Sequence, residues 1–290
     1  MKHAYLILAH DEFDVLQLLI KAIDDSRNDI FIHFDKKVER IPKLNIQHSN
    51  LYIIDKRIDV RWGDVSMVEA EYELFEIAFK KGPFAYYHLL SGVDMPLQSQ
   101  NDIHNFFEKH RGKEFVGFSE GNVTSHIDRK VKRYHLFPRH FKHGDDVLGL
   151  LRRGVRSIAL RLQYLLGIRR NINVNFKKGA QWVSITHAFV DYILPQRNAV
   201  LRMYTHSFCS DEIFLQTICW NSPFRNHIFD VNDEGMGSMR MIPWKNNKLL
   251  NWVEEDFDVL MESGRLFARK FNSNNTNLVN RIIQKITEPK

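Results

Sequence analysis

Short apolar runs alternate with helix-like repeats through the first half of the chain. The runs have polar borders and the length of buried strands, and they cover residues 5–9, 30–34, 51–54, 86–90 and 115–118. Between them, apolar residues recur every three or four positions, which predicts helices over 13–23, 67–79 and 102–107. Strands that alternate with helices usually form a parallel sheet wrapped by helices. The order therefore predicts an α/β fold with a mostly parallel sheet.

The last third of the chain has shorter signals of the same kind. They predict strands over 181–186 and 239–242, and helices over 188–194, 211–220 and 253–261. Ser210 is expected to cap the helix at 211–220. Residues 267–271 are expected to be the last ordered element before a polar tail. Because no repeat or Pro/Gly-rich linker marks a boundary, we expect one domain over residues 1–290.

An apolar stripe at helical spacing runs from Leu148 to Leu166 and is flanked by arginines. This predicts a basic amphipathic helix within an insertion at about 138–175. Such a helix can lie in an anionic membrane interface. It can equally pack on its own domain with its arginines in solvent. The pattern leaves both interpretations open.

Composition adds limits to this picture. The 290 residues are 44% hydrophobic and 26% charged, as in soluble globular proteins. No apolar stretch reaches the roughly 18 to 20 residues that a spanning helix needs. We therefore expect a cytoplasmic chain. Cys209 and Cys219 are expected to be buried thiols, since two cysteines make neither a disulfide scaffold nor a zinc cluster.

The positive charge is local. The segment Arg129–Lys178 holds 14 lysines and arginines and two acids, a net charge of +12, whereas the whole chain carries +6. An alternative function is therefore a module that binds nucleic acid or another anionic surface through this segment. The rest of the chain is net negative and the segment lacks interleaved stacking aromatics, so we expect no nucleic-acid partner.

Strand ends are where ligands bind in open α/β sheets. This rule selects His10, Asp35, Trp62 and the turn before Asp94. Asp94 has no partner acid two residues earlier, where an Asp-x-Asp metal motif would have one, because position 92 is glycine. Glycine-rich phosphate loops are absent as well.

Without a metal, side-chain cations would have to neutralise a phosphate-bearing leaving group. Arg240 and Lys270 are candidates because each lies beside apolar residues, where a charge acts more strongly. Glu212 lies at the predicted start of a helix, and it is either a helix-end charge or a general base.

Eight motifs taken in order resemble one family, the core-2/I-branching β-1,6-N-acetylglucosaminyltransferases (glycosyltransferase family 14). No single motif is decisive, but all eight occur in register along nearly the whole chain. They are His3–His10, Ile32–Lys37, Val60–Gly63 with Ser66 and Ala70, Leu89–Leu97, Lys178–Trp182, Ser210–Phe214, Arg240–Trp244 and Phe267–Phe271. The part around 138–175 has no match to the family pattern.

The resemblance implies a GT-A-like fold and a role for each matching residue. Glu212 corresponds to the catalytic base, and Arg240 and Lys270 to the cations that bind the diphosphate. The implied uridine-binding residues are Asp35, Trp62 and His10, although tyrosine stands at the Trp62 position in mammalian enzymes. The implied contacts with donor or acceptor sugar are Asp94, Glu120, Arg129, Trp182 and Asp211.

The activity implied by the resemblance is inverting, metal-independent transfer from a UDP-sugar to a glycan hydroxyl. No cofactor is expected. N-acetylglucosamine is the first donor sugar to consider, with xylose and glucuronic acid as alternatives. The expected acceptor is a glycan or lipid-linked oligosaccharide for surface polysaccharide, reached through peripheral contact with the inner face of a membrane.

Overall fold

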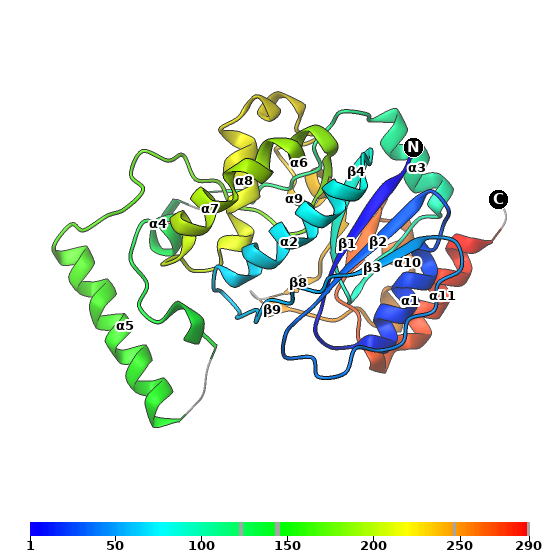
Figure 1. Cartoon of the computed structure of the whole chain (residues 1–290). Helices are drawn as coiled ribbons and strands as arrows, with labels where there is room; N and C mark the ends of the chain where they lie inside the picture. The colour runs from blue at the N-terminus through cyan, green and yellow to red at the C-terminus, as the bar shows by residue number, and fades with distance from the viewer. Residues whose placement is uncertain (122–123, 143–145, 246–247, 289–290) are drawn as a thin grey trace.

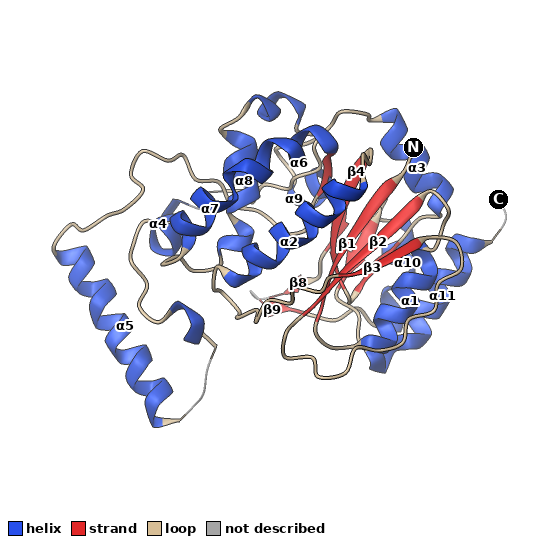
Figure 2. Ribbon diagram, in the orientation of Figure 1, coloured by secondary structure: helices blue, strands red, loops and turns tan. Residues whose placement is uncertain are grey.

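Alternate residues of the central strands face two different hydrophobic cores. A computed structural model describes residues 1–121, 124–142, 146–245 and 248–288. In its strand β1 (His3–Ala9), Tyr5 and Ile7 belong to one core cluster, and Leu6 and Leu8 belong to the other. Because successive side chains of a strand point to opposite faces, a strand that is apolar at every position needs cover on both. The result is a sheet with helices on each side (Figure 2).

Five strands form the central sheet in the order β3-β2-β1-β4-β6. The first four are parallel and β6 is antiparallel to β4. Besides β1, they are β2 (Asn28–Phe34), β3 (Asn50–Ile53), β4 (Tyr86–Ser91) and β6 (Ser184–Thr186). A second sheet has the order β5-β10-β7, and β8 and β9 form a hairpin. Their bounds are β5 (Asp94–Pro96), β7 (Arg240–Met241), β8 (Trp244–Lys245), β9 (Lys248–Leu249) and β10 (Phe267–Arg269).

Helices divide between the two faces of the sheet (Figure 1). One core is closed by α1 (Phe13–Ile23), α10 (Phe257–Glu262) and α11 (Thr276–Thr287). The other is closed by α2 (Ser66–Lys81), α6 (His187–Ile193), α7 (Arg197–Tyr204) and α8 (Phe214–Trp220). The remaining α-helices are α3 (Gln100–Lys109), α4 (Thr124–Val131), α5 (Val147–Leu165) and α9 (Glu234–Ser238).

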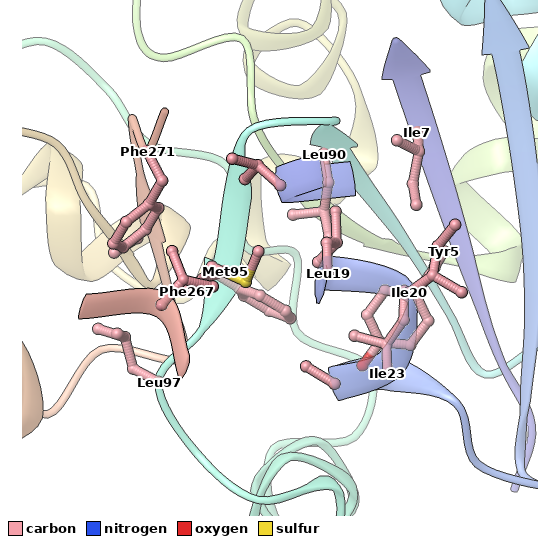
Figure 3. Packing of buried hydrophobic residues seen from close by; sticks show 14 of the residues in the cluster. Tyr5, Ile7, Leu19, Ile20, Ile23, Leu90, Met95, Leu97, Phe267 and Phe271 are labelled. Carbon is pink, nitrogen blue, oxygen red and sulfur yellow. The ribbon is translucent and has the colours of Figure 1, made fainter. Parts of the chain in front are cut away.

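The first core joins the two sheets. Figure 3 shows Leu19 and Ile20 of α1 packed beside Tyr5 and Leu90 of the central sheet, with Met95, Phe267 and Phe271 of the second sheet region close by. This packing holds the end of β10 near the carboxyl ends of the parallel strands. It thereby places Arg269 next to Asp94 and Ser91, where the site described below is built.

The predicted α/β fold is confirmed, and the strand runs of the first half all appear except one. Residues 115–118 are not a strand, since the chain makes only isolated bridges at Glu114 and Phe115. At Gly117 it turns against α9 so closely that a Cβ atom there would lie 2.4 Å from the Glu234 carbonyl oxygen. The chain therefore leaves the sheet after Phe115.

Two other predictions are wrong. Ser210 does not cap a helix at 211–220: residues Ser210–Glu212 form a 3₁₀ turn, α8 begins at Phe214, and the Ser210 hydroxyl has no hydrogen-bond partner. Nor is the tail after 271 unstructured, because it forms α11. Five of its side chains are buried at helical spacing, namely Leu278, Val279, Ile282, Ile283 and Ile286.

The basic helix α5 projects away from the body of the molecule (Figure 1). Only Gly149 and Gln163 of its 19 residues are buried. Gln163 fixes the helix by exchanging hydrogen bonds with the backbone of Tyr134, at 2.8 and 2.9 Å. Of the two interpretations of the apolar stripe, packing against its own domain is wrong. The insertion also spans residues 143–145, which lie outside the described residues.

Both cysteines are buried and free, as expected. Among the described residues, none of the helices combines the length and the apolar character required to cross a membrane.

A buried acid links the 115 region to β6 and gives a testable pH dependence. Glu114 accepts hydrogen bonds from the backbone nitrogen and the hydroxyl of Thr186, at 2.9 and 2.6 Å. Burial raises the pKa of Glu114 from 4.5 to about 7, although these hydrogen bonds oppose the rise. A raised folded-state pKa means that stability is fully present below the unfolded value and falls as pH rises through about 7.

We therefore expect Glu114→Gln to remove part of the loss of stability between about pH 4.5 and 7. The amide can accept from the Thr186 nitrogen and donate to its hydroxyl, as the protonated acid does. The difference in pH dependence should approach about 3 kcal/mol, at about 1.4 kcal/mol per pKa unit. Urea unfolding of both proteins across this range measures it, and parallel curves would contradict the assignment.

Candidate active site

A cavity of about 280 Å³ lies between the second sheet and the loops that precede β6 and α8. Its walls come from segments far apart in sequence. The charged residues that line it are Lys178, Asp211, Glu212, Glu234, Arg240, Arg265 and Arg269. Trp182 and Trp244 provide aromatic surface. Pockets with apolar walls and a few convergent polar groups are the usual form of a binding site for a small molecule.

Glu212 is held by two lysines from opposite directions. Its Oε2 lies 2.7 Å from Nζ of Lys130 on α4 and 3.5 Å from Nζ of Lys178 in the loop before β6. The backbone supports this position, because the backbone N–H of Gly179 donates a hydrogen bond to the Glu212 carbonyl oxygen, with an N···O distance of 2.9 Å. Cys209, just before the 3₁₀ turn, has a φ of 50°, in the left-handed region that non-glycine residues rarely occupy. Such backbone strain often accompanies a functional residue.

Gly179 explains how the loop before β6 can come so close to the neighbouring chain. A Cβ atom at this position would lie 1.9 Å from the Gly117 carbonyl oxygen. Only glycine permits this contact. Next to it, the backbone N–H of Ser119 donates a hydrogen bond to the Lys178 carbonyl oxygen, with an N···O distance of 2.8 Å. The close approach therefore positions Lys178 beside Glu212.

Two further acids lie behind Glu212. Burial, followed by the charge of Glu212, raises the pKa of Asp211. Burial, followed by the charge of Asp211, raises the pKa of Glu71 well above its usual value. Glu71 lies on α2 and accepts a hydrogen bond from Gln181 at 2.8 Å. The effect is to disfavour negative charge on Asp211 and Glu71, next to the Glu212 carboxylate.

Glu234 faces the cavity from α9. Its two carboxylate oxygens lie 3.3 and 3.2 Å from the Ser119 hydroxyl, which donates to them. Burial raises the pKa of Glu234, and the charge of Lys178 opposes this. Sequence reasoning missed Glu234, since it lies in a short polar stretch without a distinctive pattern.

Two guanidinium groups mark the side of the cavity nearest the second sheet. Arg269 donates from Nε to Oδ1 of Asp94 at 3.3 Å, and its guanidinium carbon lies 4.3 Å from the centroid of the Trp182 ring. Arg240 lies deeper, with a residue exposure of 2%. It donates to the carbonyl oxygens of Ser238 and Val183 and to the Ser184 hydroxyl. Burial lowers the pKa of Arg240 to about 10, so it remains charged at neutral pH.

Lys270 directly follows Arg269 but does not line this cavity. Hydrogen bonds from Ser273 lower the pKa of Glu12, and the charge of Lys270 adds to the effect. Lys270 therefore lies toward the loop after β1. The cations predicted from the sequence thus occupy two neighbouring positions along the second sheet, and Arg269, which was not predicted, lies between them.

The three residues predicted for uridine occupy the carboxyl edge of the sheet but do not meet in one pocket. The buried carboxylate of Asp35 accepts from the backbone nitrogen and Nζ of Lys37, at 2.9 and 2.8 Å. His10 is exposed, 3.3 Å from Asp11. Trp62 is 52% exposed and packs edge-on against Phe208, with ring centroids 5.3 Å apart.

A second cavity, of about 330 Å³, lies on the other side of Lys130. Its lining is basic and aromatic: Trp62, His126, Arg129, Lys130, His135, Phe141, Arg156, Leu160 and Phe208. Lys130 lines this cavity and bonds Glu212, which lines the first, so the Lys130–Glu212 ion pair lies between the two cavities. We call them the Arg269 cavity and the Trp62 cavity.

The other predicted sugar contacts distribute between these places. Trp182 and Asp211 line the Arg269 cavity, and Arg129 lines the Trp62 cavity. Asp94 is buried beneath Arg269, where burial raises its pKa. Glu120 is exposed and lines neither. Lys178 and Arg129, the ends of the basic segment, thus face different cavities.

Comparison with known proteins identifies the family of the chain. The family model described as Core-2/I-Branching enzyme matches residues 3–256. The chain belongs to the Core-2/I-branching enzyme family. The match includes Glu212 and Arg240, and it ends before β10 with Arg269 and Lys270.

Relatives that are similar in sequence include xylosyltransferases. The chain is 23% identical over 293 residues to xylosyltransferase 2 of Canis lupus familiaris, covering 93% of this chain and 32% of the relative. It is 23% identical over 300 residues to xylosyltransferase 2 of Homo sapiens, again covering 93% of this chain and 32% of the relative. It is 22% identical over 301 residues to xylosyltransferase 1 of Homo sapiens, and this match covers 93% of this chain and 29% of the relative. The chain thus spans about a third of the length of the curated relatives it matches.

Metal ligands do not cluster at this site. Over the described ranges there is no group of three or more histidine, cysteine, aspartate or glutamate residues arranged to hold a metal ion.

Proposed function

We propose that this member of the Core-2/I-branching family is an inverting, metal-independent glycosyltransferase that uses a UDP-sugar donor and a glycan acceptor. The observation that carries the proposal is the position of Glu212. Its carboxylate lines a cavity with buried guanidinium groups and pairs with Lys130, which lines a second cavity with exposed aromatic surface. A transferase that joins two substrates needs a proton acceptor at such a junction.

In the proposed reaction, Glu212 accepts the proton of an acceptor hydroxyl. The freed oxygen forms a bond to the anomeric carbon, and the bond from that carbon to the diphosphate oxygen breaks. The electron pair leaves with UDP, and the configuration inverts because attack comes from the opposite side. Glu212 is thus the catalytic residue for the acceptor half of the reaction.

Charge on the departing diphosphate would be stabilised by Arg269 and Lys270. Arg240 would support them as a fixed positive charge from beneath. Oriented donors in a partly dry site stabilise developing charge without having to reorganise. Asp35 and His10 are proposed to hold the uridine along the sheet edge, and Trp182 with Asp211 to contact the transferred sugar.

We propose that the donor sugar is one of a small number of candidates. N-acetylglucosamine follows from the family resemblance, and xylose from the names of the relatives. A screen of UDP-sugars for UDP release, including slow hydrolysis without acceptor, distinguishes them. A lipid-linked oligosaccharide is the acceptor class that we propose to test first.

We expect Glu212→Gln to lower the rate of transfer by about 10²–10⁴-fold while UDP binding is kept. The amide keeps the shape of the side chain but cannot accept the proton. UDP release under saturating donor measures turnover, and isothermal calorimetry measures UDP affinity. The matched control is Glu262→Gln, an exposed position on α10, which should behave as wild type. Turnover close to wild type in Glu212→Gln would refute the assignment of the base.

Transfer should persist in excess EDTA, since the positive charge at the leaving group is proposed to come from side chains. The measurement is initial velocity with and without EDTA, on protein purified in chelator. Complete loss of activity that is restored by added manganese would overturn metal independence while leaving the transferase assignment intact.

A further inference from the structure

The Trp62 cavity has the composition of a site for an anion attached to a ring. Among the described residues that line it, Arg129, Lys130 and Arg156 are cationic, two are histidines, and none is acidic. Lys130 has its counter-charge in Glu212. Uncompensated positive charge in a concave site attracts anionic ligands.

One of these cations has an unused donor. Nη1 of Arg156 is buried and has no hydrogen-bond partner. The guanidinium carbon lies 4.6 Å from the centroid of the Phe141 ring, which fixes its plane. A buried donor without a partner is costly, and a carboxylate or phosphate oxygen would satisfy it with a charge-assisted hydrogen bond.

The aromatic side of the same cavity fits a sugar ring. Phe208 packs against both Phe141 and Trp62, with ring centroids 4.5 and 5.3 Å apart. These contacts hold Trp62 in place and leave about half of its surface free. Aromatic rings with charged neighbours are typical of pockets that bind partly apolar, partly polar ligands.

We propose that the Trp62 cavity binds the acceptor and selects an acidic glycan, one in which a sugar near the reacting hydroxyl carries a carboxylate or phosphate. Arg129 and Arg156 bind the anion, and Trp62 packs on the ring. Lys130 lines this cavity and bonds Glu212, so a sugar bound here has its hydroxyl groups near the base. The proposal rests on the proposed function, because it assigns the acceptor of that reaction.

The test uses three soluble probes: methyl β-glucuronide, glucose 6-phosphate and methyl β-glucoside. Calorimetry on wild type should show binding of at least one anionic probe that is tighter than binding of the neutral one by about ten- to hundredfold, as expected for charge-assisted hydrogen bonds. The two anionic probes distinguish carboxylate from phosphate recognition. Equal affinity for all three probes, or no binding of either anionic probe at millimolar concentration, would overturn the proposal.

The variant Arg129→Gln/Arg156→Gln should remove this preference and bring the affinity for the anionic probes down to that for methyl β-glucoside. Arg111→Gln, an exposed arginine at the end of α3, is the matched control and should keep the preference. If the double variant keeps the preference, the proposal fails. If instead wild type releases no UDP from any UDP-sugar, the proposed function fails, whichever probe binds.

A separate observation concerns the exposed stripe of α5. Leu151, Val155, Ile158, Leu162 and Leu165 follow one another at intervals of four, three, four and three residues, and all are exposed; Leu151 is 61% exposed and Leu165 is 81% exposed. The stripe continues into Leu166 and Ile168. Contiguous apolar surface of this kind marks an interaction site.

The charge of α5 identifies its partner. The helix carries Arg152, Arg153, Arg156 and Arg161 and no acid. A second copy of the same helix would bring four more arginines against these four. In an anionic bilayer, the leucines would instead be buried among the lipid chains and the arginines would contact negative headgroups. We infer that α5 lies on the surface of an anionic membrane.

Vesicle sedimentation tests this inference without any assay of activity. Binding to vesicles of phosphatidylglycerol and phosphatidylcholine should exceed binding to phosphatidylcholine alone and should weaken with added salt. Ile158→Ser/Leu162→Ser and Arg152→Gln/Arg161→Gln should each reduce binding by about tenfold or more, at about 1 kcal/mol per basic residue and more for a buried leucine.

Val259→Ser, which changes an exposed residue of α10, is the control and should bind as wild type. Equal binding to both kinds of vesicle would overturn the inference. So would a dimer in light scattering that the Ile158→Ser/Leu162→Ser change abolishes, because the stripe would then join two copies of the chain.

Discussion

The pairing of one carboxylate with two lysines fixes the geometry on which the rest of the site depends. Lys130 comes from α4, Lys178 from the loop before β6, and Glu212 from the turn before α8. Three segments far apart in the sequence therefore meet at a single charged group. A partly buried carboxylate needs such partners, because removing its hydration without compensation is costly. Burial of Asp211 and Glu71 keeps the competing negative charge low around this group.

Arg240 makes a different kind of contribution beneath the same cavity. Its guanidinium is bonded to backbone carbonyls around β6 and α9 and to the Ser184 hydroxyl, and it lies 4.3 Å from the Phe267 ring of β10. A charge buried in this way ties the central sheet to the second sheet. Both arginines line the cavity. Nη1 and Nη2 of Arg240 already donate to protein oxygens, whereas Arg269 makes longer bonds, of 3.3 and 3.5 Å, to Asp94 and Ser91. Arg240 thus supports the site from beneath, and Arg269 is the arginine that is freer to contact a ligand directly.

Local pattern was enough to predict the layered sheet, since β1, β2 and β4 each contain a run of apolar residues and are buried at every position, and α2 has a clear apolar face. It was not enough for α11, whose buried residues are separated by asparagine, arginine and lysine and so resemble a polar tail. In the site, Glu212, Arg240 and Trp182 were found because they stand in motifs. Glu71 and Glu234 were missed because each lies in an ordinary local sequence. Arg269 was missed because the resemblance assigned the cation of the Phe267–Phe271 motif to Lys270. Only the tertiary fold shows that Glu71 is buried behind Asp211 and that Arg269 stacks on Trp182.

The helix α5 contributes to two surfaces at once. Its arginine at position 156 and its leucine at 160 form part of the Trp62 cavity, whereas the leucines at 151 and 162 point to solvent. A helix adsorbed on a bilayer would therefore hold the mouth of that cavity at a set height above the lipid. Encounter with a lipid-borne acceptor then becomes a two-dimensional search, so turnover would follow the surface density of acceptor in the bilayer and not its bulk concentration.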